Sequence, residues 1–235
     1  MNREKGGKGI AYSIAFRTKI YAAFFLLICL TIISCSLTPR PVIPAGEIKS
    51  LKAEGSFFYR GEAGQGRSRL LLYLQAPDQI RLEIFNPLGG LAYIIWFNDT
   101  WASLYLPGQK VFWEGETQVL TAEFLGGVVT ARELVCLFSG RLKEFVSNPN
   151  WHLFGKEAEN FYAGQKGDWR FEVKEFFQGG EIPRTIYFEK PGHTVRLRIL
   201  KIRFNQLFQA EVFIPSYTST ALKLSWEEIS RLWKK

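Results

Sequence analysis

The residue types that perform catalysis are few and scattered in this chain. Its 235 residues include three cysteines and two histidines, His152 and His193. Neither histidine has a second histidine at metal-ligand spacing or a serine or cysteine in a nucleophile-elbow context. The run Gly61-x4-Gly66-Arg67-Ser68 imitates a phosphate-binding loop with Arg in place of Lys. Such a loop opens a helix, whereas a strand-like run follows here, so a hairpin turn is expected.

We therefore expect a protein that is not an enzyme and that needs neither a metal ion nor another cofactor. Three cysteines and two histidines are too few for a zinc cluster or a disulfide framework. The acidic residues still offer carboxylate pairs, which leaves a membrane-tethered hydrolase as an alternative.

Cys35 follows a basic and then an apolar N-terminal segment. Residues 1–34 carry five basic side chains against one acid, and residues 20–34 form an uncharged run. As a helix this run is about 22 Å long, short of the ~30 Å hydrocarbon core of a bilayer. A basic region followed by a short apolar region is typical of a secretory signal.

The end of this run, Ile32-Ile33-Ser34-Cys35, resembles the bacterial lipobox. The resemblance implies cleavage before Cys35 and attachment of diacylglycerol to its thiol. Several acyl chains, at about 0.8 kcal/mol per buried methylene, would hold the protein on a membrane. The alternative is an uncleaved signal anchor whose cysteine happens to fall at its end.

The residues after Cys35 indicate the destination and the domain boundaries. Ser36 stands where Asp commonly retains lipoproteins in the inner membrane, which implies the outer membrane, with the domain facing the periplasm. Prolines at 39, 41 and 44 favour an extended tether. We expect a signal peptide over 1–34, a tether over 35–46 and a single domain over 47–235.

The composition excludes several classes of protein. Hydrophobic residues make up 47% and charged residues 22%, which excludes intrinsic disorder and collagen. The 20 Phe, 9 Tyr and 7 Trp favour strands and large apolar surfaces over a helical bundle. Half of the net charge of +8 lies in residues 1–34, and no long basic run follows. No nucleic-acid partner is expected.

Regularly spaced apolar runs between turn residues predict an antiparallel meander. In residues 79–85, Ile80, Leu82 and Ile84 alternate with Arg81 and Glu83, as in a sheet with one face in solvent. The other predicted strands are residues 56–60, 69–75, 91–97, 101–106, 110–113, 169–176, 185–189, 194–204 and 208–214.

Two helices are predicted from capping-box spacing. Thr130-x-x-Glu133 begins a helix that runs to position 138 or 142, with Gly140 near its end. Ser225-Trp-Glu-Glu228 begins a short C-terminal helix. Cys136 in the first helix is either a buried apolar group or a reactive thiol, and no basic neighbour in the sequence would activate it.

The turn Asn86-Pro87-Leu88-Gly89-Gly90 is the most distinctive internal feature. Proline fixes one backbone angle and the glycines permit positive φ, so the turn can present Leu88 outward. The other possibility is that Leu88 folds back into the core.

With the lipobox, this turn makes the chain resemble the LolB family, the outer-membrane receptors for lipoproteins, whose members carry an Asn-Pro-Leu-Gly turn after such a strand. The order of Gly55, this turn, Gly140 and Pro183 also matches. The resemblance covers most of residues 35–215, while the helix after Tyr217 departs from the family pattern.

The resemblance implies a mainly β fold, a half-open antiparallel β-barrel closed by one or more helices, with an apolar cavity for acyl chains. A monomer would receive acylated lipoprotein cargo from a soluble periplasmic carrier and insert it into the outer membrane. Pro87, Leu88 and Gly89 would form the membrane-insertion turn. The cavity candidates are Phe57, Ile80, Leu82, Ile84, Tyr93 and Phe97. A related lipid-binding or envelope-assembly lipoprotein with another cargo is the alternative.

Overall fold

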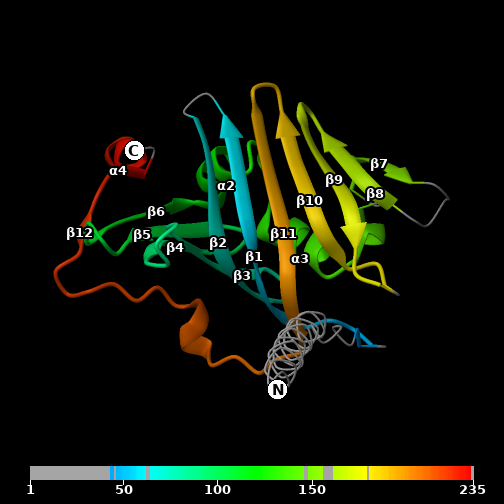
Figure 1. Cartoon of the computed structure of the whole chain (residues 1–235), viewed down its shortest axis with the longest axis horizontal. Coiled ribbons are helices and arrows are strands. Elements are labelled where there is room, and N and C mark those ends of the chain that lie inside the picture. Colours follow the sequence, from blue (N-terminus) through cyan, green and yellow to red (C-terminus); the bar gives the residue numbers. More distant parts are fainter. Residues whose placement is uncertain are drawn as a thin grey trace, which may run out of the picture. The chain divides into compact units, whose positions relative to one another are not determined.

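One continuous sheet carries the fold of this computed structural model (Figure 1). The structure describes residues 43–44, 46–61, 64–145, 148–155, 161–178 and 180–233. The predicted signal peptide, Cys35 and most of the predicted tether lie outside the described residues.

The sheet contains twelve strands among the described residues, in the order β12-β6-β5-β4-β3-β2-β1-β11-β10-β9-β8-β7. Neighbouring strands are antiparallel, except for the short parallel pair β12–β6. The strands are β1 (Ser50–Gly61), β2 (Gly64–Gln75), β3 (Gln79–Phe85), β4 (Leu91–Phe97), β5 (Trp101–Leu106), β6 (Val111–Glu116), β7 (His152–Gly155), β8 (Phe161–Lys166), β9 (Trp169–Phe176), β10 (Pro183–Lys190), β11 (His193–Phe204) and β12 (Leu222–Lys223).

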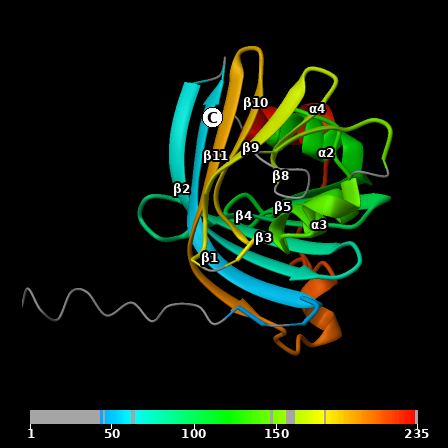
Figure 2. The same ribbon diagram turned by 90° about the vertical axis from the view of Figure 1, so that its right-hand side faces the viewer.

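The sheet curves around two short helices, α2 (Thr117–Phe124) and α3 (Ala131–Phe138), which lie on its concave side (Figure 2). A third helix, α4 (Trp226–Trp233), packs against β6. Two 3-10 turns, η1 (Leu142–Phe145) and η2 (Ala210–Phe213), complete the described elements. The expected fold class, an open curved antiparallel sheet closed by helices, is confirmed.

Gly55 marks a bend in the long central strand β1. The pairing of β1 with β11 shifts register between Glu54 and Gly55. A Cβ atom at Gly55 would lie 2.4 Å from the carbonyl oxygen of Arg198 on the neighbouring strand. Only glycine permits this close approach, and such irregularities increase the local bend and twist of a strand.

Both capping boxes predicted from the sequence are present. The Glu133 amide donates to Thr130 Oγ1 at 3.1 Å, and the Thr130 amide donates to Glu133 Oε2 at 2.9 Å. At the other end of α3, Gly140 has φ +74°, and the Arg141 amide donates to the Cys136 carbonyl at 2.8 Å. This is a Schellman-type end, which favours glycine. Ser225 and Glu228 cap α4 in the same reciprocal way.

One predicted strand is wrong. Residues 208–214 form an extended segment and the η2 turn, not a strand of the sheet. They belong to a longer segment, residues 205–221, which we call the C-terminal strap and which crosses the outer face of the sheet before β12 and α4 (Figure 1). The main-chain carbonyl of Val212 accepts hydrogen bonds from Arg81 at 3.1 Å and from Trp96 Nε1 at 3.2 Å.

The strap explains why the predicted solvent-facing side of β3 is partly covered. The Arg81 and Glu83 side chains are only 20% and 12% exposed and pair with each other at 2.6 Å. Further along, Tyr217 stacks on Phe112 with 4.0 Å between ring centroids, and its hydroxyl donates to Glu114 at 3.0 Å. The strap covers a small apolar cluster on the outer face of β4 and β5. The buried members of this cluster are Ile94, Trp96 and Tyr105.

Candidate functional site

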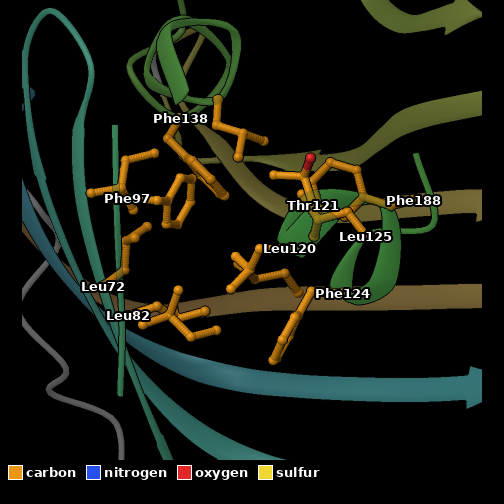
Figure 3. Close-up of a pocket in the computed structure, with 13 residues that line it drawn as sticks. Leu72, Leu82, Phe97, Leu120, Thr121, Phe124, Leu125, Phe138 and Phe188 are labelled. Carbon is orange, nitrogen blue, oxygen red and sulfur yellow. The ribbon is translucent and has the colours of Figure 1, made fainter. Parts of the chain in front are cut away.

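An apolar cavity lies between the concave face of the sheet and the helices α2 and α3 (Figure 3). Its volume is about 40 Å³. One wall consists of the strands β2, β3, β4, β10 and β11. The other consists of α2, its C-cap residue Leu125, and α3. The lining residues are Leu72, Ile80, Leu82, Ile95, Phe97, Leu120, Thr121, Phe124, Leu125, Leu134, Phe138, Phe188 and Leu197. All of them except Thr121 are apolar, so the cavity suits a hydrocarbon.

Three of the six residues predicted from the sequence line this cavity. They are Ile80, Leu82 and Phe97. Tyr93 lies next to it, because its ring packs edge-on against Phe124 with 5.7 Å between centroids. Ile84 and Phe57 are buried elsewhere in the same core and do not line the cavity.

The helix α2 supplies lining residues that the sequence analysis missed. Leu120 and Phe124 stand four residues apart, which places them on one face of a helix. That spacing was the available signal. It was weak because the helix spans only eight residues and its N-cap residue, Glu116, makes no side-chain capping bond.

The cavity is small in this structure. Pockets that hold drug-sized ligands measure roughly 300–1,000 Å³, far more than the space found here. An acyl chain can enter only if the helices move away from the sheet. The ends of α2 are tied by Thr117 Oγ1, which donates to the Asn98 carbonyl at 2.6 Å, and by Trp169 Nε1, which donates to the Leu125 carbonyl at 2.8 Å. Between these two ties, α2 faces the sheet with the apolar side chains of Leu120 and Phe124.

Helix α3 is held more firmly than α2. The buried carboxylate of Glu133 accepts hydrogen bonds from Trp151 Nε1 at 2.7 Å and from Lys166 Nζ at 3.1 Å. It also accepts the capping bond from the Thr130 amide. A charge that is paired and hydrogen-bonded in this way fixes its element in place, since losing a partner would leave it uncompensated. The α3 wall of the cavity therefore has a buried polar anchor, and α2 is held at its two ends by Thr117 and Leu125.

The predicted insertion turn projects into solvent. Leu88 is 96% exposed. Asn86 organises the turn, because its side-chain oxygen accepts hydrogen bonds from the amides of Leu88 at 3.0 Å and Gly90 at 2.9 Å. Gly89 has φ +87°, a conformation that favours glycine. Of the two possibilities left open by the sequence, the structure selects the outward one for Leu88, and Pro87 is exposed beside it.

Cys136 is a buried thiol. Its Sγ donates to Glu144 Oε2 at 3.2 Å. Burial, assisted by this hydrogen bond, raises the pKa of the thiol to about 12. The thiolate is the reactive form, so this environment agrees with a packing role.

The described part of the chain contains no group of three or more His, Cys, Asp or Glu residues able to hold a metal ion. No helix within the described ranges is long and apolar enough to cross a membrane.

Comparison with known proteins identifies the fold and no family. No family model matches the chain, and no curated protein matches it in sequence. Among solved structures, a DUF1329 family protein from Desulfovibrio piger has a TM-score of 0.51 at 11% identity, covering 71% of this chain and 90% of that one. This likeness shows a shared fold.

A LolA superfamily protein from Nitrosomonas europaea is also similar, with a TM-score of 0.47 at 10% identity over 71% of this chain and 90% of that one. This likeness is too low to carry an inference. Neither structure is described as a LolB receptor, so membership of that family stays a prediction.

Proposed function

We propose that this protein is a membrane-anchored receptor that binds acyl chains between its curved sheet and the helix α2. The observation that carries the proposal is the cavity lining, which consists of apolar side chains with the single exception of Thr121. Burial of each methylene group in such a site contributes about 0.8 kcal/mol. A chain of ordinary length therefore supplies enough free energy to offset a displacement of α2.

The finer proposal is that the acylated cargo is a lipoprotein, received from a soluble periplasmic carrier and passed to the outer membrane. The lipobox-like Ile32-Ile33-Ser34-Cys35 and the Asn-Pro-Leu-Gly turn support it. In this scheme Cys35 holds the domain at the membrane and Leu88 enters the bilayer during release.

A displacement experiment tests the proposal. The purified protein is loaded with an environment-sensitive apolar dye, and an acylated peptide is compared with its unacylated form. We expect displacement by the acylated form alone. Equal displacement by both peptides would contradict acyl binding.

A pair of variants locates the binding site. Leu120→Trp fills the space between α2 and the sheet and should weaken dye binding about tenfold. Leu200→Trp makes the same change at a residue that is 56% exposed, and it should leave dye binding unchanged. Melting temperatures of both variants establish that they fold, and Leu82→Phe is a milder substitution into the same cavity.

A further inference from the structure

A second pocket lies at the tips of two neighbouring hairpins, β1–β2 and β10–β11. Its volume is about 340 Å³. The two tips meet because β1 pairs with β11, with Arg60 opposite Thr194. The lining residues are Arg60, Gly61, Lys190, Gly192, His193 and Thr194.

This pocket is basic. Arg60 and Lys190 are exposed, and neither forms an ion pair with any residue that the structure describes. No Asp or Glu is among the described residues that line the pocket. Two unpaired cations beside a histidine and a hydroxyl group offer the donors that a phosphate or carboxylate group requires.

His193 adds a polar atom without a partner. Its ring donates a hydrogen bond to the main-chain carbonyl of Phe124, which leaves Nε2 buried and without a hydrogen-bond partner among the described residues. Burial, and then the charge of Lys190, lower the pKa of His193, while Glu123 acts in the opposite direction. A bound anion would offset the charge of Lys190 and favour protonation of the His193 imidazole, whose ring also packs edge-on against Tyr59 with 5.1 Å between centroids.

The end of α2 joins this pocket to the apolar cavity. Phe124 lines the cavity with its ring (Figure 3), and its carbonyl group accepts the His193 hydrogen bond. Two residues later, a Cβ atom at Gly126 would lie 2.9 Å from His193 Cδ2 and 3.3 Å from Lys190 Cγ. A ligand whose chain lies against Phe124 would therefore have its polar end close to the basic pocket.

We propose that Arg60, Lys190 and His193 bind the phosphate headgroup of an anionic lipid whose acyl chain occupies the apolar cavity. This inference rests on the proposed acyl-binding function and names the ligand class. The diacylglyceryl group of a lipoprotein is neutral and would leave the basic pocket without a partner. The basic pocket therefore defines a ligand class in addition to the lipoprotein cargo proposed above, namely an anionic lipid.

Three probes test the inference on the full chain: dodecyl phosphate, dodecyl maltoside at the same chain length, and inorganic phosphate. The two amphiphiles are titrated below their micelle concentrations. We expect dodecyl phosphate to bind about tenfold more tightly than the maltoside, the equivalent of about 1.4 kcal/mol. Inorganic phosphate should bind more weakly than either. The preference for dodecyl phosphate should shrink as ionic strength rises.

Variants assign the preference to this pocket. Arg60→Gln combined with Lys190→Gln should abolish the preference and leave the affinity for dodecyl maltoside unchanged. Arg203→Gln removes one positive charge at the other end of β11, and this variant should retain the preference for dodecyl phosphate. In the wild-type protein, dodecyl phosphate should also raise the pKa of His193, followed by NMR.

The outcomes separate this inference from the proposed function. Equal affinity for the two amphiphiles, or a preference that survives the double variant, would overturn the headgroup site and leave acyl binding intact. Binding of inorganic phosphate as tight as that of dodecyl phosphate would show a site for free anions. Failure of both amphiphiles to bind would overturn acyl binding itself.

Discussion

Ile84 and Leu88 are four residues apart in one strand and its turn, yet they have opposite environments. Ile84 is 0% exposed and Leu88 is 96% exposed. The alternation in β3 predicts the burial of Ile84, because every second side chain of a half-buried strand points toward the core. The exposure of Leu88 could not be decided from the sequence, since a turn can present its apolar residue to solvent or pack it against the core.

Leu88→Glu should leave stability unchanged and impair delivery. The side chain has no packing to lose, so we expect a melting temperature within a few degrees of the wild type. Transfer of a bound acylated cargo into liposomes should fall strongly, because a charge at the turn opposes entry into the bilayer.

Ile84→Glu is the matched control in the same strand-turn unit. It buries an uncompensated charge and removes packing, and it should destabilise the fold by several kcal/mol. Normal transfer by a stable Leu88→Glu protein would exclude the turn from delivery.

Cys136 should be unreactive in the native protein. With the pKa raised to about 12, roughly one thiol in ten thousand is ionised at pH 8. In a Cys29→Ala, Cys35→Ala variant, we expect negligible alkylation at pH 8 without denaturant and complete alkylation after unfolding. Rapid labelling of the folded protein would show that the helix α3 opens or that the thiol is activated.

Among the helices and strands, the sequence predicted the bounds most accurately where the local residue pattern was strong. The strands β3, β4 and β5 have the predicted bounds. Strict alternation of apolar and charged residues defines β3, and the turns Asn98-Asp99 and Pro107-Gly108 mark the two ends of β5. The capping boxes of α3 and α4 were equally readable, because two side chains at a fixed spacing satisfy the first amides of a helix.

The elements that the sequence missed depend on contacts made at long range. The strap looked like a strand at residues 208–214 because it is apolar. Its actual partners, Arg81 and Trp96, lie more than a hundred positions away. The strands β7 and β8 and the helix α2 are short and also depend on tertiary packing, since isolated elements of this length are marginal.

Tyr217 should make the attachment of the strap sensitive to alkali. Burial raises the pKa of its phenol above the usual 10, with the hydrogen bond to Glu114 acting in the same direction. A raised pKa means that its stabilising contribution is complete below pH 10 and is lost as the pH rises through the folded value. Unfolding by denaturant, followed at pH 8 and pH 11, should show a steeper loss of stability for the wild type than for Tyr217→Phe.

The comparison with Tyr217→Phe isolates this residue from the other tyrosines. At pH 8 the variant should be less stable by about 1–2 kcal/mol, because the Ser103 and Glu114 side chains lose a partner. Identical slopes for the two proteins between pH 8 and pH 11 would show that Tyr217 ionises freely in the folded state.

For the molecule as a whole, we propose a receptor in which α2 is the movable wall of the acyl-binding cavity. The curved sheet and α3 are fixed by strand pairing and by the Glu133 network, while Thr117 and Leu125 each hold one end of α2 by a hydrogen bond. The strap shields the outer face of β4 and β5, which leaves the concave side as the apolar surface able to accept a ligand. Acyl binding on that side is the central claim.

Photolabelling tests this claim most directly. A palmitoyl lipid with a diazirine at the end of its chain is incubated with the full-length protein, irradiated and mapped by mass spectrometry. We predict labels in residues 72–97 and 117–138, which contain most of the cavity lining, and their loss on addition of excess unlabelled lipid. Labels concentrated in the strap, or spread evenly over the chain and insensitive to competition, would contradict it.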